Sequence, residues 1–296
     1  MKIEHSIHSA LLRETIKVVV VGAGGTGSAL LPRLMQLHFA MKELGHPGGL
    51  QVTLYDDDIV SKANIGRQCF FPQDVGQYKA TLIINRLNQC WGTSWEAVPK
   101  KIKKSDRINA DIMIGCVDSR KGRAAIIGAS SGYHCYYIDA GNNENTGQVV
   151  IGELYEGNRK AVRLPHVGDL FPDMVNAELD AKDDKPSCSV AEALQKQSLV
   201  INNTMANEVF NLLWMLIRNG KLNYSGKFVN LESGHARPIA LDTEVWARMG
   251  YNAPIPKEKK KAAAEPVAAK GSATPSGGGA CLSHPSYPCA RAAVCS

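Results

Sequence analysis

The sequence predicts an α/β fold: a Rossmann-like, doubly wound and mostly parallel sheet with an antiparallel extension and a disordered C-terminal tail. Three observations carry this prediction. A β-branched run at 17–22 breaks into glycines and continues as a helix-forming segment. Strand-like and helix-like segments then alternate as far as residue 141. Beyond residue 142 the alternation stops, and residues 254–296 are rich in Ala, Gly, Pro and Ser.

Seven elements are expected in the alternating part. Strands that alternate with helices at this spacing pair in parallel, and their helices cover both faces of the sheet. Pro32 lies inside the first expected helix and either kinks or restarts it. In chain order we expect a strand at 17–22, a helix at 25–44, a strand at 50–56, a helix at 75–90, a strand at 110–118, a helix at 120–131 and a strand at 135–141.

The second part of the chain has a different pattern, which predicts antiparallel strands and one long helix. Its expected elements are strands at 147–157 and 160–165, a polar loop at about 171–187, a helix at 190–220 that ends at Gly220, and a strand pair at 227–234 and 236–242.

The composition excludes several classes of protein. Hydrophobic residues make up 44% of the 296 residues and charged residues 21%, which is typical of a globular protein. The net charge is +6, but five Lys, one Arg and two Glu in residues 257–296 account for +4 of it, so nucleic-acid binding is not indicated. No apolar run could span a bilayer, and the N-terminus does not resemble a signal peptide, so we expect a cytoplasmic protein. No two of the eight cysteines form a C-x-x-C pair, and the chain should fold without zinc.

The glycine-rich turn predicts a nucleotide site. It contains Gly22, Gly24, Gly25 and Gly27, which let backbone N–H groups at the start of a helix approach a phosphate. The turn alone fits both NAD and ATP. Gly24→Ala and Gly27→Ala are expected to abolish ATP binding, if ATP is the ligand, while leaving the fold largely intact.

Polar residues after the second and third strands favour ATP. Asp56 is the expected acceptor for the ribose hydroxyls, and Asp58 is a further candidate in the same run. The segment that follows carries two cations and two amides, which are Asn64, Arg67, Gln68 and Lys79. Two cations suit a bound triphosphate better than they suit a hydride donor. Asp118 ends the third strand and is the natural ligand for Mg²⁺ among phosphates, with a helix N-cap as its alternative role.

Four segments, in this order, resemble the adenylating domain of the ThiF, MoeB and HesA family, which is related to the ubiquitin-activating enzymes. They read GAGGTGS, DDDIVSKANIGRQ, DVGQYKA and CVDS, and the resemblance covers about residues 17–215. Two stretches closely resemble the family members of the PRTRC cassettes of bacterial plasmids and related mobile elements: LGHPGGLQVTLYDDDIVSKANIGRQCFFPQDVG and PSCSVAEAL. The resemblance implies an adenylation domain at 1–253, with a nucleotide-binding half at 17–141, a partner-binding half at 142–253, and a tail at 254–296.

The resemblance also implies roles for individual residues. Gly24 and Gly27 would contact phosphates and Asp56 the ribose; Asn64, Arg67 and Lys79 would line the triphosphate, with Asp118 on Mg²⁺. Arg123 matches a family arginine, and a role on the helix surface is its alternative. Family members form homodimers, but the arginine that bacterial homologues supply from the partner subunit has no counterpart here.

Family members adenylate the C-terminal carboxylate of a small ubiquitin-like protein, and this is the activity that the resemblance implies. The catalytic set would be Arg67, Lys79, Asp118 and Cys188. Cys188 stands at a loop-to-helix junction, where N–H dipoles lower a thiol pKa, and it could receive the activated partner; a capped structural thiol is the alternative. Two other functions stay open: an ATP-binding interaction module that transfers nothing, and an NAD-dependent oxidoreductase.

Overall fold

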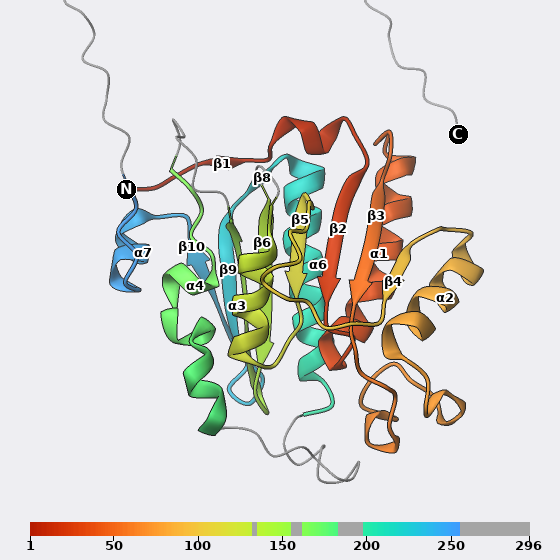
Figure 1. The fold of residues 1–296 in the computed structure, drawn as a ribbon. Helices are drawn as coiled ribbons and strands as arrows, with labels where there is room; N and C mark the ends of the chain where they lie inside the picture. The colour runs from red at the N-terminus through yellow and green to blue at the C-terminus, as the bar shows by residue number, and fades with distance from the viewer. Residues whose placement is uncertain (132–134, 155–161, 183–197, 255–296) are drawn as a thin grey trace, which may run out of the picture. The chain divides into compact units, whose positions relative to one another are not determined.

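The computed structural model describes residues 1–131, 135–154, 162–182 and 198–254. Its main sheet has eight strands in the order β10-β9-β7-β6-β5-β2-β3-β4, and a separate pair joins β1 to β8 (Figure 1). Strand β2 pairs in parallel with β3 on one side and with β5 on the other, and β4 and β6 extend this parallel half. The predicted fold class, a doubly wound and mostly parallel α/β sheet with an antiparallel extension, is therefore confirmed.

The elements have the following bounds. The strands are β1 (His5–Ser6), β2 (Ile16–Val21), β3 (Leu50–Tyr55), β4 (Glu96–Val98), β5 (Ile112–Gly115), β6 (Tyr136–Asn142), β7 (Thr146–Glu153), β8 (Lys221–Leu222), β9 (Tyr224–Asn230) and β10 (His235–Ala240). The helices are α1 (Gly25–Glu43), α2 (Lys79–Trp91), α3 (Arg120–Ala129), α4 (Val167–Leu170), α6 (Ile201–Asn219) and α7 (Thr243–Arg248).

The parallel half forms where the sequence offers continuous apolar runs. Every residue of β2 except Lys17 is buried, as expected of a strand with helices on both faces. Helix α1 comes next and continues without a break through Pro32. The side chains of Leu30 and Leu34 in this helix are fully buried. Helix α6 packs against α1, β6 and β7, while α3 lies on the opposite face of the sheet (Figure 1). The core is thus formed by the central strands and the helices on both sides of them.

The antiparallel extension agrees with the prediction except after β7. Strand β7 pairs antiparallel with β6 and with β9, and β9 pairs with β10. The strand expected at 160–165 is wrong for its described part, because residues 162–165 are not in a strand. Leu164 is nevertheless tied to Glu153, because the Glu153 N–H donates to the Leu164 carbonyl and the Leu164 N–H donates to the Glu153 carboxylate, each at 3.0 Å.

Two further expectations in this half are corrected. The polar loop expected from 171 contains two short 3-10 helices, at Pro172–Val175 and Ala177–Lys182. The long helix begins at Ile201, because the Ser198 N–H donates to the Glu144 carbonyl instead of joining the helix. Cys188 and all but the first residue of the 254–296 tail lie outside the described residues, and the division into domains stays a prediction. Among the helices that the structure describes, none is long and apolar enough to cross a membrane.

Candidate functional site

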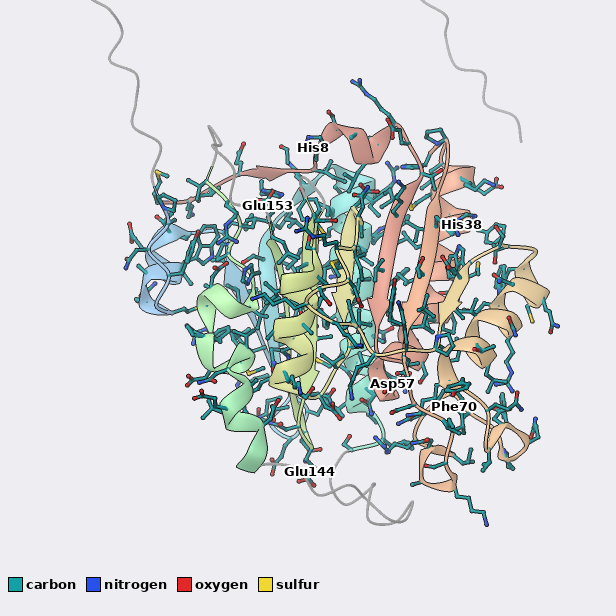
Figure 2. The ribbon with its side chains drawn as sticks, in the orientation of Figure 1. His8, His38, Asp57, Phe70, Glu144 and Glu153 are labelled. Atoms are coloured by element: carbon teal, nitrogen blue, oxygen red, sulfur yellow. The ribbon has the colours of Figure 1, made fainter. Side chains whose placement is uncertain are left out.

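The predicted site residues gather at the edge of the sheet where β2, β3 and β5 end. Figure 2 shows Asp57, directly after β3, and Glu144, between β6 and β7, toward this edge, with Glu153 at the opposite one. The loop after β2 and the first turn of α1 supply the glycines. The segment after β3 supplies Asp56 through Lys79, and the segment after β5 supplies Asp118. Carboxyl ends of parallel strands, where the strand order reverses, are the usual place for a ligand in such sheets.

Two of the four glycines let the chain pack closely. Gly22 has φ +99°, and a Cβ there would lie 2.5 Å from the Cys116 carbonyl oxygen. A Cβ on Gly27 would lie 1.9 Å from the Gly22 carbonyl oxygen. Both glycines therefore allow the start of α1 to approach β2 and β5, which is a structural role.

The other two glycines differ: Gly24 borders an opening, whereas Gly25 packs against α6. Gly24 caps α1 with no side-chain hydrogen bond to the first turn, and a Cβ there would meet nothing within 4 Å. A Cβ on Gly25 would lie 2.4 Å from the side chain of Asn202, the second residue of α6. The N–H groups at the start of α1 thus face space that an anion could occupy.

The glycine turn is braced by a residue that sequence reasoning missed. Thr26 Oγ1 donates to Asn202 Oδ1 at 3.2 Å, and Asn142 Oδ1 lies 3.3 Å from the same hydroxyl. Asn202 is 3% exposed, although it is an amide in an apolar helix. The only sign of this role in the sequence is that Asn202 is a polar residue on the buried face of α6. Nothing in the sequence links Asn202 to the glycine turn, which lies far away along the chain.

The structure allows a clean test of the glycine turn. Gly24→Ala should weaken ATP binding by about ten- to hundredfold, because its methyl group would displace a phosphate from charge-assisted N–H contacts, without loss of stability. Gly27→Ala should instead destabilise the protein by about 1–3 kcal/mol, because its methyl group overlaps a backbone oxygen. The expectation that Gly27→Ala leaves the fold largely intact stays a prediction, and the close approach to the Gly22 carbonyl oxygen counts against it. ATP titration together with urea unfolding of both variants distinguishes the two roles, and wild-type ATP affinity in Gly24→Ala would remove Gly24 from the site.

Asp56 ties the end of β3 to the glycine turn. Its Oδ2 accepts from the Ala23 N–H at 2.6 Å, and its Oδ1 accepts from the Asp58 N–H at 2.9 Å. Burial raises the pKa of Asp56, and these two backbone donors oppose that shift. Each carboxylate oxygen can accept more than one hydrogen bond, so contact with a ribose stays a prediction.

Asp58 and Lys79 form an ion pair. Lys79 Nζ lies 2.8 Å from Asp58 Oδ2, with the lysine side chain 6% exposed and the aspartate 64% exposed. The Lys79 N–H also donates to the Asp58 carbonyl at 2.9 Å. In the structure the Asp58 side chain therefore contacts Lys79, the first residue of α2. Contact of either side chain with a nucleotide stays a prediction.

Asn64, Arg67 and Gln68 have three different environments. Asn64 Oδ1 accepts from Ser61 N at 2.8 Å and from Ser61 Oγ at 3.1 Å, which shapes the turn. Among the described residues, Gln68 Oε1 is a buried oxygen without a hydrogen-bond partner. Burial lowers the pKa of Arg67, and the nearby charge of Asp118 raises it in part. The structure thus brings Arg67 close to Asp118 and leaves the next residue, Gln68, with a buried acceptor.

Asp118 is exposed and stands just before α3. Its alternative role as a helix N-cap is wrong, because Ser119 caps α3 by accepting from Gly122 N at 3.1 Å. Within the described ranges, no group of three or more His, Cys, Asp or Glu side chains could hold a metal by itself. A single exposed carboxylate fits Mg²⁺ that takes most of its ligands from phosphates and water, so the residues present fit that ion when it arrives with a nucleotide.

A buried ion pair lies beneath Asp118. Arg123 Nε lies 2.9 Å from Asp139 Oδ1, and Tyr137 donates its hydroxyl to the same oxygen at 2.9 Å. Arg123 is 4% exposed and Asp139 is fully buried, so a helix-surface role for Arg123 is wrong. The arginine also donates to the Asp118 carbonyl at 3.3 Å. Arg123 thereby supports the main chain that carries Asp118.

Asp180 is a second residue that sequence reasoning missed. It accepts from the N–H groups of Arg120 and Lys121, at 2.8 Å each, at the start of α3. Desolvation raises its pKa, but these backbone donors and the neighbouring arginines lower it overall. It fastens the segment after α4 beside Asp118. The polar stretch around it gave no sequence signal for this contact.

The four cysteines that the structure describes fall into a buried pair and an exposed pair. Burial raises the pKa of Cys116 and of Cys135 to about 12, so both thiols are neutral. Cys69 and Cys90 are exposed. Cys188 lies outside the described residues.

Comparisons with known proteins agree with this geometry. A family model described as the ThiF family matches residues 9–243. Among solved structures, selenomethionine PaaA matches 76% of the chain at 16% identity with a TM-score of 0.52, and E. coli MccB with succinimide matches 76% at 19% identity with a TM-score of 0.52. E. coli MccB with AMPCPP and MccA matches 76% at 18% identity with a TM-score of 0.50. The chain spans 64% of the length of each of these proteins, and the likeness at this identity shows a common fold.

Proposed function

The chain belongs to the ThiF family, whose model matches residues 9–243, and from this premise we propose that it is an ATP-dependent adenylyltransferase. Its substrate would be the C-terminal carboxylate of a small ubiquitin-like protein. The observation that carries the proposal is the convergence of an open glycine turn at Gly24, the cations Arg67 and Lys79, and the carboxylate of Asp118 at one edge of the sheet. These groups suit a triphosphate with its metal better than a dinucleotide.

The reaction needs charge neutralisation more than acid or base catalysis. A carboxylate is already ionised at neutral pH, so no residue has to remove a proton from it. A carboxylate oxygen attacks the α-phosphorus, the bond from that phosphorus to the bridging oxygen of the β-phosphate breaks, and pyrophosphate leaves. Mg²⁺, when bound, would neutralise charge on the phosphate oxygens.

The chain's own residues would orient and balance these charges. The N–H groups around Gly24 would hold phosphate oxygens, and Arg67 and Lys79 would balance the charge of the departing pyrophosphate. Asp118 would hold the metal, with its main chain supported by Arg123. Gln68 Oε1 would accept a hydrogen bond from the bound nucleotide, which would satisfy a buried acceptor.

The MccB structures support a peptide or small protein as the substrate. One of them contains E. coli MccB with AMPCPP and MccA. The fold shared with that protein is consistent with a chain that binds both an ATP analogue and a small protein or peptide. Three finer points also belong to the proposal: a homodimer, which the resemblance to the family implies; a cytoplasmic location, which is expected from the sequence pattern; and a plasmid-borne gene cassette, which the resemblance to PRTRC members implies.

The test of this function is AMP formation that depends on the partner's terminal carboxylate. The candidate is the small protein that co-purifies with this chain. The intact partner should support release of AMP and pyrophosphate from ATP, and a partner with an amidated C-terminus should not, because it lacks the nucleophile. Tight ATP binding without AMP formation would instead support the alternative of a non-catalytic interaction module. Binding of NADH would support an oxidoreductase.

Transfer of the activated partner to Cys188 is a further part of the proposal. The thiolate would attack the acyl carbon of the adenylate, form a thioester and release AMP. A thiol-sensitive adduct with the partner should appear on a non-reducing gel and disappear in Cys188→Ala. Cys90→Ala is the matched control, because that thiol is exposed near the end of α2 and should leave the adduct unchanged. An adduct that survives in Cys188→Ala would assign the acyl group to another residue.

A further inference from the structure

Helices α1 and α6 lie side by side on one face of the sheet and begin at the same edge of it (Figure 1). Each is 19 residues long. Gly24 and Val200 are their N-caps, and in neither helix, as the structure describes it, does the N-cap side chain bond to the first turn. Neither first turn contains an acidic residue. Two helix starts, with their N–H groups and positive dipole ends, therefore lie together without a carboxylate in either first turn.

The two helix starts meet at the glycine turn. A Cβ on Gly25, the first residue of α1, would lie 2.4 Å from Cγ and 2.5 Å from Nδ2 of Asn202, the second residue of α6. Residue 25 must therefore be a glycine, because the Asn202 amide occupies the place of its side chain. A Cβ on the adjacent Gly24 would meet no described atom within 4 Å. The amide thus lies one residue away from the opening at Gly24.

Asn202 also holds the next residue of the turn. Thr26 Oγ1 lies 3.2 Å from Asn202 Oδ1 and 3.3 Å from Oδ1 of Asn142, the last residue of β6. The hydroxyl has one hydrogen, which the two amide oxygens share. Thr26 is 5% exposed and Asn202 is 3% exposed, so water competes little for these bonds. The first turn of α1 is therefore fixed relative to both β6 and α6.

An amide is not the most stabilising side chain for this position. A carboxylate would accept the same hydrogen bond from Thr26, and it would lie beside two helix starts, where negative charge is favourable. It would also stand one residue from the opening at Gly24, where it would repel the phosphates of the proposed nucleotide. The neutral amide forgoes that stabilisation and leaves the positive ends of both helices to a bound anion.

We propose that Asn202 is a positioning residue for the triphosphate. It acts through Thr26, whose hydroxyl it binds and whose main chain belongs to the first turn of α1, and it brings no charge that would compete with the phosphates. The inference rests on the proposed function, in which the N–H groups around Gly24 hold phosphate oxygens. It adds that part of the affinity for ATP comes from α6, a helix in the other half of the chain.

The first test is a double-mutant cycle on ATP binding, measured by calorimetry with Mg²⁺ and without a partner protein. Asn202→Ala and Thr26→Val should each weaken ATP binding by about tenfold, because each removes one side of the same hydrogen bond. The double variant should lose no more affinity than the weaker of the two single variants, because both act through one contact. Circular dichroism and urea unfolding show that each variant is folded under the conditions of the titration.

The second test changes the charge and keeps an acceptor for Thr26. Asn202→Asp should weaken ATP binding by about thirtyfold or more, which exceeds the loss in Asn202→Ala, because its carboxylate repels the phosphates. The loss should be smaller for AMP, which carries fewer negative charges. Asn203→Asp is the matched control, because it places the same charge on the next residue of α6, which is exposed. Its affinity for ATP should stay within about twofold of wild type, since solvent screens that charge.

Three results would overturn this inference and leave the proposed function intact. They are unchanged ATP affinity in folded Asn202→Ala and Thr26→Val, losses that add in the double variant, and equal losses in Asn202→Asp and Asn203→Asp. A variant that only unfolds more easily, with wild-type affinity in its folded form, belongs to the first of these. If Asn202→Asp does not fold, the cycle decides by itself. Failure of the wild-type protein to bind ATP would instead count against the proposed function and this inference together.

Discussion

Asp118→Asn is expected to lower ATP–pyrophosphate exchange by about two to three orders of magnitude with no loss of folding stability. Asp118 is exposed, and the N-cap of α3 is formed by Ser119, so the fold does not depend on its charge. An amide is a poor substitute for a carboxylate that must hold Mg²⁺ among phosphates. The measurement is exchange at saturating partner, with thermal unfolding recorded on the same preparation.

Asp57→Asn is the matched control for that variant. Asp57 is also an exposed aspartate at the edge of the sheet, and its nearest cation is Lys101 at 4.0 Å. Removing this charge should leave exchange within about twofold of wild type, because exposed pairs at this distance contribute little. Full exchange in Asp118→Asn would contradict the metal-binding role. An equal loss in Asp57→Asn would show that general loss of negative charge, and not the metal site, is responsible.

Arg123→Met is expected to lower the free energy of unfolding by about 3–5 kcal/mol. The substitution leaves the fully buried Asp139 without its cation, although Tyr137 still donates to it. Asp139 already has a pKa raised by burial, and without Arg123 this shift grows. An acid whose pKa is raised in the folded state binds more protons there than when unfolded. The variant should therefore regain stability as the pH falls from about 8 to about 5.

Urea unfolding at several pH values checks this prediction. Lys101→Ala is the control, because its pair with Asp57 is exposed and should contribute less than about 1 kcal/mol. A loss below about 1 kcal/mol in Arg123→Met, or stability that falls further with decreasing pH, would contradict a buried pair. If Arg123 also supports Asp118, residual exchange in the folded variant should be lower than in Lys101→Ala.

The parallel half of the fold could be predicted from the sequence because its signals are local. Ile16–Val21 is a run of β-branched residues with a glycine turn behind it, and such a run buried on both faces has few alternatives. The same locality explains the failures. The polar residues 172–182 predict a loop, but most of them form two short 3-10 helices. Asp180, in the second of these, accepts a hydrogen bond from the backbone at the start of α3. No local pattern records a contact made with a distant helix start.

The position of the site could also be predicted from the sequence, but the contacts within it could not. Asp56, Lys79 and Asp118 each follow a strand or begin a helix at one edge, so their grouping follows from the parallel topology. The topology does not predict which side chains contact each other. The ion pair between Asp58 and Lys79 is known only from the structure. Asn202 joins the glycine turn from α6, far along the chain, and its role depends on helix packing that the sequence does not express.

The measurement that tests the adenylyltransferase most directly is isotope exchange between pyrophosphate and ATP. The intact protein, supplied with Mg²⁺ and its small co-purifying partner, should return labelled pyrophosphate to ATP, because formation of an acyl-adenylate is reversible. Exchange should disappear when the partner's terminal carboxylate is amidated. A protein that binds ATP and the partner together but catalyses no exchange would contradict the account.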